Sequence, residues 1–249
     1  MKKVTRRRIT VPSVEGKMIE GTKTAHIVLS VFGEKTAFEF LKTYADLRKQ
    51  GADSLILDLR DNGGGLLETA VNLLSNFVTK DKLLVTTKEK NSFNNRSYFS
   101  YGPGDVAVPV VVLVNENTAS ASEITAGALK DYERAIIVGT KTYGKGSVQQ
   151  PFVLSDGSEL KVTVAKWYTP LDHGIDKIGI DPDVLVNFEK EDYDKRYDRQ
   201  LEEAKKVIEK LKKSDRTSVL NEYAKRAAET KEEKMDSETS ASGSVKRDK

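Results

Sequence analysis

The sequence of 249 residues contains no cysteine and only two histidines, His26 and His173. The absence of cysteine excludes disulfides, thiolate nucleophiles and cysteine-ligated metals, and it leaves the compartment open. His26 begins an apolar run, where we expect a half-buried strand residue, and His173 lies in a turn-rich segment. Two isolated histidines give no reason to predict a metal site. A triad based on histidine would have to use one of these two.

Excess charge and long apolar runs are also lacking. The 41 Lys and Arg nearly balance the 38 Asp and Glu, so the net charge is only +3, which gives no reason to expect nucleic acid as a partner. No apolar run approaches the roughly 18–20 residues of a membrane span. The basic N-terminus has no apolar segment and does not read as a signal peptide.

Strands and helices alternate through residues 23–190, which we take as the core domain of the chain. Apolar, β-branched runs predict strands at 25–32, 54–60, 106–115 and 134–139. Amphipathic segments predict helices at 36–51, 66–78 and 120–132. A continuous apolar strand such as 54–60 is typical of a parallel sheet that is buried on both faces. The pattern therefore favours an α/β domain with a mainly parallel sheet flanked by helices.

The other segments differ in composition. Residues 1–22 form a basic arm with short β-like pieces and a turn at Glu20-Gly21. Residues 91–105 read as a polar, aromatic loop, and residues 152–170 as a β-hairpin that turns at Asp156-Gly157. We expect a helical extension over 191–229 and a disordered polar tail over 230–249.

Three loops rich in glycine or serine each follow a predicted strand. They are DNGGG at 61–65, NENTASASE at 115–123 and GTKTYGKGS at 139–147. Functional sites in open α/β sheets form at the carboxyl ends of the strands. We therefore expect the three loops to meet at one edge of the sheet.

The middle loop carries Ser120 at a strand-to-helix turn. There its hydroxyl is exposed, and the free N–H groups of the first helical turn can stabilise an oxyanion. The same residues also fit a capping box, in which Ser120 accepts a hydrogen bond from the N–H of Glu123. From this loop alone, the cap is the simpler interpretation.

The third loop matches the GxxxxGK frame of a phosphate-binding loop, with Lys145 as the lysine. Gly146 stands where a Ser or Thr should hold magnesium, and the residues that follow do not predict a helix to bind phosphate. A nucleotide hydrolase is therefore disfavoured. Lys145 is then a lysine fixed in a glycine-rich turn, or simply a solvated one. The glycines at 63–65 allow close backbone approach, although a tight turn alone would explain them.

Taken together and in order, these motifs resemble the C-terminal processing peptidases, also called tail-specific proteases. The resemblance runs from about Val4 to Val186 and includes the closing stretch GIDPDV. It implies a crotonase/ClpP-like core with a β-hairpin and a C-terminal helix. It also implies a serine endopeptidase that cleaves protein or peptide substrates near their C-termini, without metal or cofactor. A homo-oligomer is left open, and an extracytoplasmic location is implied.

The resemblance also implies the role of each site residue. Ser120 would be the nucleophile and Lys145 its general base, while Gln149 would orient the amine. The backbone N–H groups of Ala121 and Gly64 would form the oxyanion hole. Because a free lysine has a pKa near 10.4, we expect a desolvated Lys145 with no carboxylate beside it.

Two departures from the family pattern stand out. Gly63 replaces the proline that usually follows Asn62. In addition, Met1 comes about where the family's substrate-binding PDZ domain would have ended. We therefore expect a core without that domain, whether by truncation, as a fragment or as a natural short form. A catalytically silent or PDZ-dependent peptide-binding scaffold is the main alternative. A crotonase-like acyl transferase is another, although nothing in the sequence marks a coenzyme A site.

Overall fold

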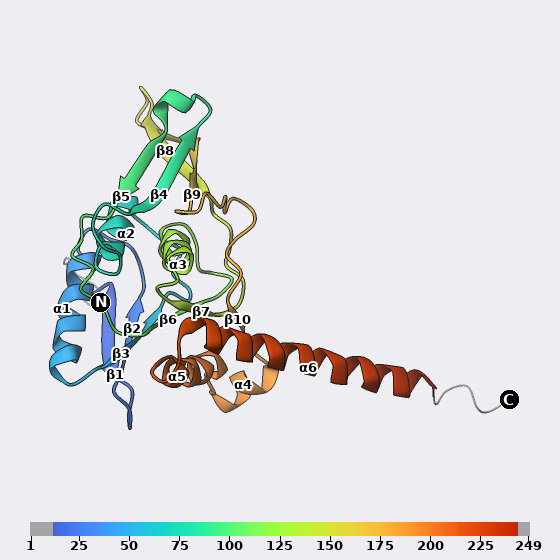
Figure 1. Ribbon diagram of the computed structural model, residues 1–249. Helices are drawn as coiled ribbons and strands as arrows, with labels where there is room; N and C mark the ends of the chain where they lie inside the picture. The colour runs from blue at the N-terminus through green and yellow to red at the C-terminus, as the bar shows by residue number, and fades with distance from the viewer. Residues whose placement is uncertain (1–11, 244–249) are drawn as a thin grey trace, which may run out of the picture. The chain divides into compact units, whose positions relative to one another are not determined.

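The computed structural model describes the backbone of residues 12–243 and the side chains of residues 12–229. The chain divides into two compact units, residues 1–208 and 209–249. The first unit holds two sheets with their helices (Figure 1). The second consists of the end of α5 and the helix α6 (Arg216–Gly243).

The large sheet of the first unit has six strands in the order β1-β2-β3-β6-β7-β10. Its first strand, β1, is antiparallel to β2, and the remaining neighbours are parallel. The strands are β1 (Val14–Met18), β2 (Thr24–Leu29), β3 (Ser54–Asp58), β6 (Val110–Val114), β7 (Ile136–Gly139) and β10 (Val184–Leu185). The predicted mainly parallel sheet is therefore confirmed. Part of the predicted N-terminal arm is not separate from the core, because β1 is an edge strand of this sheet.

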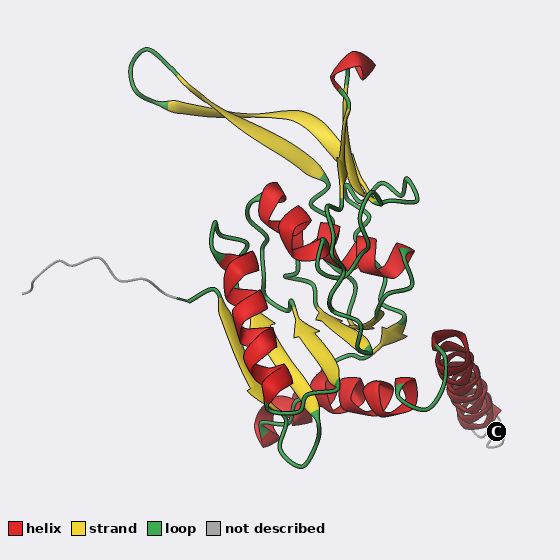
Figure 2. Ribbon diagram, turned by 60° about the vertical axis from the view of Figure 1, so that its left-hand side comes forward, coloured by secondary structure: helices red, strands yellow, loops and turns green. Residues whose placement is uncertain are grey.

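Every residue of the central strands β3, β6 and β7 is buried. Apart from Ser54 and Asp58 at the ends of β3, their side chains are apolar on both faces, and so both faces need a cover. Three helices cover one face: α1 (Thr36–Lys49), α2 (Leu67–Leu74) and α3 (Ala121–Asp131). Phe40, Leu73 and Leu129 of these helices belong to the main hydrophobic core. The first turns of α5 (Arg199–Leu211) lie on the other side of the sheet (Figure 2).

The small sheet is antiparallel and has the order β5-β4-β9-β8. Its strands are β4 (Leu83–Glu89), β5 (Arg96–Phe99), β8 (Ser147–Val153) and β9 (Glu159–Tyr168). Its two hairpins stand away from the helices (Figure 2), while β4 packs against both α2 and α3. The predicted turn at Asp156-Gly157 is confirmed by Gly157, which has a φ of 83° and donates to the carbonyl of Leu154 at 3.0 Å.

The predicted loop over 91–105 is partly wrong, because it contains a 3-10 turn, η1 (Ser92–Asn94), and strand β5. All four residues of β5 are exposed or half-buried, so the strand has no apolar alternation to reveal it. Pairing with β4 imposes the extended backbone, as often happens when context outweighs strand propensity.

The C-terminal part is helical: α4 (Lys190–Lys195) precedes α5 and α6. The backbone of α6 continues to Gly243, through much of the segment where composition predicts disorder; residues 244–249 lie outside the described range. None of the described helices combines the length and the hydropathy needed to cross a membrane.

Candidate active site

The three loops meet at the carboxyl ends of β3, β6 and β7, as expected. The N–H of Ala119 donates to the carbonyl of Asn62 at 3.0 Å, which joins the first loop to the second. The N–H of Tyr143 donates to the carbonyl of Thr118, also at 3.0 Å, which joins the second loop to the third. Neighbouring parallel strands thus bring segments from distant parts of the sequence to one edge of the sheet.

Ser120 lies directly before α3 with φ of 57° and ψ of −119°. A positive φ is uncommon for a residue with a side chain, and such strain occurs at functional sites. The side chain is half-exposed, and Ser120 forms a capping box with Glu123, whose carboxyl group accepts from the N–H of Ser120 at 2.9 Å. Ser120 is therefore at the same time a helix cap and a residue of the cavity described below.

Glu123 has a wider role than the sequence indicates. Its side chain is fully buried and also accepts hydrogen bonds from Thr142 Oγ1 at 2.5 Å, from the N–H of Gly144 at 2.7 Å and from the N–H of Lys145 at 2.8 Å. One carboxyl group therefore joins the serine loop (residues 115–123) to the lysine loop (residues 139–147). The signal in the sequence was the capping box, which predicts Glu123 only as a partner of Ser120.

The backbone of Lys145 is held from two sides. Its N–H donates to Glu123, and its carbonyl accepts from the indole Nε1 of Trp167 at 2.9 Å. The next residue, Gly146, packs so closely against the backbone of Asp176 that an added Cβ would lie 2.2 Å from the Asp176 nitrogen. Glycine is required there because no side chain fits between the two segments.

The side chain of Lys145 is exposed, contrary to the desolvated lysine that we expected. Among the described side chains, no carboxylate forms an ion pair with its ammonium group. The expectation of a desolvated side chain is therefore not met. The reason is that the backbone of the loop is buried by Glu123 and Trp167 while the side chain extends into an open cavity.

The DNGGG loop is fixed by Asn62, which is fully buried. Its Nδ2 donates to the carbonyl of Leu29 at 2.6 Å, and its Oδ1 accepts from the N–H of Gly64 at 2.9 Å. Gly64 has a φ of 97° and lies against the serine, because an added Cβ would be 2.7 Å from Ser120 Cβ. The N–H of Gly64, the predicted oxyanion donor, is thus already engaged. Within residues 12–229, the N–H groups of Gly65 and Ala121 have no acceptor.

Ser120, Lys145 and Gln149 line one cavity of about 440 Å³, together with Gly65 and Ala121. Its volume lies in the range of ligand pockets. The rest of the lining is largely apolar with two charged side chains; it includes Leu66, Leu67, Glu68, Ile124, Val148, Lys161 and Trp167. Three residues predicted from two separate motifs therefore share one site.

A register shift lies beside the lysine side of the cavity. Val148 of β8 pairs with Ala165 and Gln149 pairs with Thr163, so that Val164 of β9 is left without a partner. The extra residue is in β9, and such an irregularity bends the strand that carries it. Both Val148 and Gln149, on the β8 side of the shift, line the cavity.

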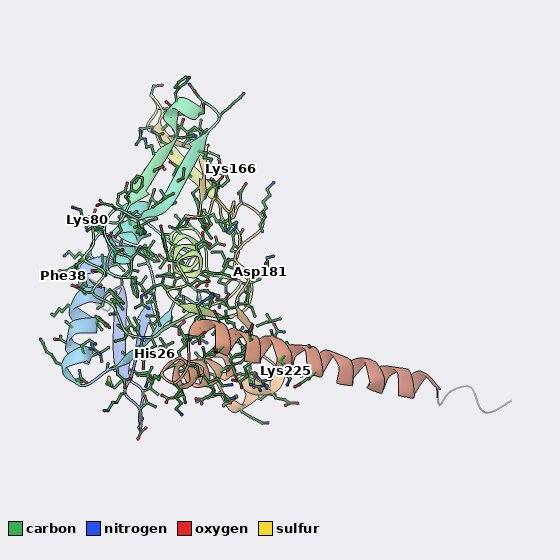
Figure 3. The ribbon with its side chains drawn as sticks, viewed as in Figure 1. His26, Phe38, Lys80, Lys166, Asp181 and Lys225 are labelled. Atoms are coloured by element: carbon green, nitrogen blue, oxygen red, sulfur yellow. The ribbon has the colours of Figure 1, made fainter. Side chains whose placement is uncertain are left out.

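Neither histidine lines the cavity. His26 is buried in β2, where its Nε2 lies 3.0 Å from Asp58 Oδ2, and Figure 3 shows it far from the small sheet, on which Lys166 is labelled. His173 is exposed and lies 3.4 Å from Asp131. The described residues contain no cluster of three or more side chains suited to hold a metal ion.

Comparison with known proteins agrees with this geometry. The model of "Peptidase family S41" matches residues 23–186. The chain belongs to peptidase family S41. The match contains all three loops and β8, and it confirms the resemblance to the C-terminal processing peptidases.

Individual relatives carry names of the same kind. The chain is 45% identical over 186 residues to a carboxyl-terminal-processing protease of Picosynechococcus sp., covering 74% of this chain and 44% of that protein. It is 39% identical over 191 residues to the carboxy-terminal processing protease CtpB of Bacillus subtilis, covering 77% and 39% respectively. Among solved structures, the photosystem II D1 C-terminal processing protease matches with a TM-score of 0.61 and 37% identity, over 74% of this chain and 50% of that one. The chain therefore spans less than half the length of the two curated relatives.

Proposed function

We propose that this chain is the catalytic core of a serine endopeptidase that cleaves protein substrates near their C-termini. The observation that carries the proposal is the shared cavity, in which Ser120, Lys145 and Gln149 come together from three different elements. The family membership of residues 23–186 supports it independently.

In the first half of the reaction, Ser120 Oγ attacks the carbonyl carbon of the scissile peptide bond while Lys145 Nζ accepts the hydroxyl proton. The tetrahedral intermediate collapses as the C–N bond breaks, and Lys145 returns the proton to the leaving amine. The product is an acyl-enzyme on Ser120. In the second half, water attacks this ester, again with Lys145 as base, and the proton returns to Ser120.

The negative oxygen of each intermediate needs preorganised donors. Ala121 supplies one N–H at the start of α3, where the helix dipole also favours negative charge. For the second donor we propose Gly65 in place of Gly64, because the N–H of Gly64 donates to Asn62 and that of Gly65 lies free at the cavity wall. Gln149 orients the amine of Lys145 from β8.

Because the cavity is open, the substrate itself must shield the side chain of Lys145 from water. Lys145 can accept a proton only in its neutral form, which an apolar and water-free environment favours. Its side chain is exposed, and so a bound peptide must cover it against Leu66, Val148 and Trp167. Substrate binding would then complete the catalytic site.

The relatives' names, which describe carboxyl-terminal processing, point to protein substrates. From the resemblance to the C-terminal processing peptidases we also propose an extracytoplasmic location for this chain. We leave a homo-oligomer open and expect no nucleic-acid partner, since the net charge is only +3.

The test is the cleavage of an unstructured protein, such as casein, by the wild-type chain and by Ser120→Ala and Lys145→Ala variants. We expect cleavage by the wild type and a loss of at least about 10³-fold in both variants, since the two groups act as a unit. An acyl-enzyme should be detectable by mass spectrometry after brief incubation with an activated ester.

Cleavage that persists in both variants would contradict the Ser–Lys assignment. A wild-type chain that binds peptides but neither cleaves them nor forms the acyl-enzyme would instead support the silent scaffold. Lys145→Arg serves as the matched control, because it keeps a positive charge but cannot act as a base. We expect it to be as inactive as Lys145→Ala.

A further inference from the structure

Arg60 follows β3 and directly precedes the DNGGG loop, and its guanidinium group is saturated with acceptors. Nε and Nη2 donate to the carboxylate of Asp58 at 2.9 and 2.7 Å. Nη1 and Nη2 donate to the two oxygens of Asp198 at 2.8 and 2.9 Å, and Nη1 also to Gln200 Oε1 at 3.3 Å. Only 13% of the side chain is exposed. Such forked pairs are strong and geometrically specific.

The two partners at the start of α5 are themselves fixed. Asp198 caps the helix, because its Oδ1 also accepts from the N–H of Leu201 at 2.9 Å. Gln200 is fully buried, and its Nε2 donates to the carbonyl of Val186 at 2.9 Å. Both residues lie beyond residue 186, where the match to the peptidase family ends. The C-terminal extension therefore contributes contacts that the family model does not contain.

The electrostatics of this network favour the charged forms. Burial opposes ionisation of Asp58, but hydrogen bonds from Arg60 and His26 outweigh it and hold the pKa of Asp58 below its ordinary value. Burial also opposes the charge on Arg60, and Asp58 with Asp198 outweigh it, so that the pKa of Arg60 is raised. If Asp198 lost its charge, the guanidinium would keep only half of its carboxylate partners.

Arg60 is only a few residues away from the active-site loop, so its fixed position also restricts the loop. It is followed by Asp61, which has a φ of 58°, and by Asn62, whose carbonyl holds the N–H of Ala119. Four and five residues after Arg60 come Gly64, in contact with Ser120, and Gly65 on the cavity wall. A shift at the end of β3 therefore displaces the proposed oxyanion donor relative to the nucleophile.

We propose that Asp198 and Gln200 are positioning residues for the peptidase reaction: by holding Arg60, they keep the Asp61–Gly65 loop in register with Ser120. The inference rests on the proposed function and adds a role for the C-terminal extension. Neither residue touches the substrate. Their effect is on the tetrahedral intermediate, whose oxygen needs the loop in place, and not on the binding of the ground state.

The test compares Asp198→Asn with Asp192→Asn. Asparagine caps helices as well as aspartate does, so Asp198→Asn preserves the cap of α5 while it removes the charge and one of the two oxygens that accept from Arg60. Asp192 is the matched control: it forms a similar pair with Arg199, with Nε at 2.7 Å, in the same extension and without contact to Arg60. Asp198→Glu, which keeps the charge, should recover part of the activity.

For peptide hydrolysis by Asp198→Asn we expect kcat to fall about 10- to 100-fold with KM changed less than about twofold, as for a small misplacement of a catalytic group. A peptide aldehyde, whose adduct oxygen occupies the oxyanion position, should bind weaker by the same factor. Asp192→Asn should leave both quantities within about twofold of wild type.

A second readout does not require activity. Hydrogen–deuterium exchange of the peptide covering residues 61–66 should accelerate about tenfold in Asp198→Asn and not in Asp192→Asn. Equal exchange and equal kcat in the two variants would overturn the inference. If the wild-type chain failed to cleave any peptide, the proposed function would be wrong. The hydrogen–deuterium exchange of residues 61–66 alone would then test whether Asp198 positions the loop. Should Asp198→Asn fail to fold, Asp198→Glu takes its place. Its kcat and its hydrogen–deuterium exchange are then compared with those of Asp192→Asn, and equal values would overturn the inference.

Discussion

The two sides of the cavity are built differently. On the side of the large sheet, Ser120 and Gly65 lie in loops after buried strands and Ala121 begins α3. There Glu123 and Asn62 bind the backbone of neighbouring segments. On the side of the small sheet, Gln149 belongs to β8, an edge strand whose residues are all exposed or half-buried. Lys145 belongs to both, because its backbone is fixed and its side chain is exposed.

The difference indicates which part of the site exists before the substrate arrives. The proposed nucleophile and oxyanion donors are held by the core, so their geometry depends on the stability of the fold. Gln149 belongs to the small sheet and the side chain of Lys145 is exposed, so the environment of these two side chains depends on what fills the cavity. Mutations on the first side should therefore reduce stability and activity together, and mutations on the second side should reduce activity alone.

The largest effect should come from Glu123→Gln. An amide has one oxygen where the carboxylate accepts four hydrogen bonds, so buried N–H groups lose their acceptor at about 1–3 kcal/mol each. We expect a loss of about 4 kcal/mol in the free energy of unfolding, measured by urea denaturation, and no detectable hydrolysis. Glu116→Gln is the control, since Glu116 is exposed in the same loop and bonds only Thr140 at 3.0 Å. Equal effects in the two variants would contradict the role of Glu123.

The same contrast explains what the sequence could predict. The strands of the large sheet were predictable because burial on both faces demands continuous apolar runs, and the three loops were predictable because each follows such a run. The strand β5 and the start of β8 were not, since neither carries an apolar pattern. Glu123 was predicted only as the partner of Ser120, because Thr142 and Lys145 are far away in the sequence. The engagement of Gly64 depends on the rotamer of Asn62, which no spacing reveals.

The next effect should come from Asp58→Asn at the end of β3 in the large sheet. The folded-state pKa of Asp58 is held below its ordinary value of 3.8, so the stability that its charge contributes is present above about pH 4 and is lost as the pH falls through the folded-state pKa. At pH 7 we expect the variant to be less stable by about 3 kcal/mol, because Arg60 loses a buried partner. The difference from wild type should shrink toward pH 3.

Urea denaturation of wild type and variant between pH 7 and pH 3 measures this dependence. Asp46→Asn is the control, because Asp46 pairs with Lys49 at 3.2 Å on the surface with 54% of its side chain exposed. It should change the free energy of unfolding by less than about 0.5 kcal/mol at every pH. A difference for Asp58→Asn that stayed constant over the whole range would contradict the argument from its charge.

A smaller effect is expected where the two sides join, from Gly146→Ala. The added methyl group would overlap the backbone of Asp176, and overpacking of this kind costs about 1–3 kcal/mol. The lysine loop must move to relieve this overlap with Asp176. We therefore expect kcat to fall by more than the smaller fraction of folded protein would explain. Gly63→Ala provides the comparison, since an added Cβ there meets nothing within 4 Å. Thermal unfolding and peptide hydrolysis of both variants decide whether the lysine loop tolerates displacement.

The smallest effect on stability should come from Gln149→Ala. Gln149 is exposed on an edge strand, so its removal should change the free energy of unfolding by less than about 0.5 kcal/mol. Hydrolysis should nevertheless slow about tenfold in kcat with KM nearly unchanged, since in the proposed mechanism Gln149 orients the amine of Lys145 and contributes little to binding. Gln150→Ala is the matched control, because Gln150 is equally exposed but does not line the cavity. If both glutamines could be replaced without loss of activity, Gln149 would line the cavity without orienting Lys145. If Gln149→Ala lowered the free energy of unfolding markedly, mutations on the side of the small sheet would not reduce activity alone, contrary to the prediction.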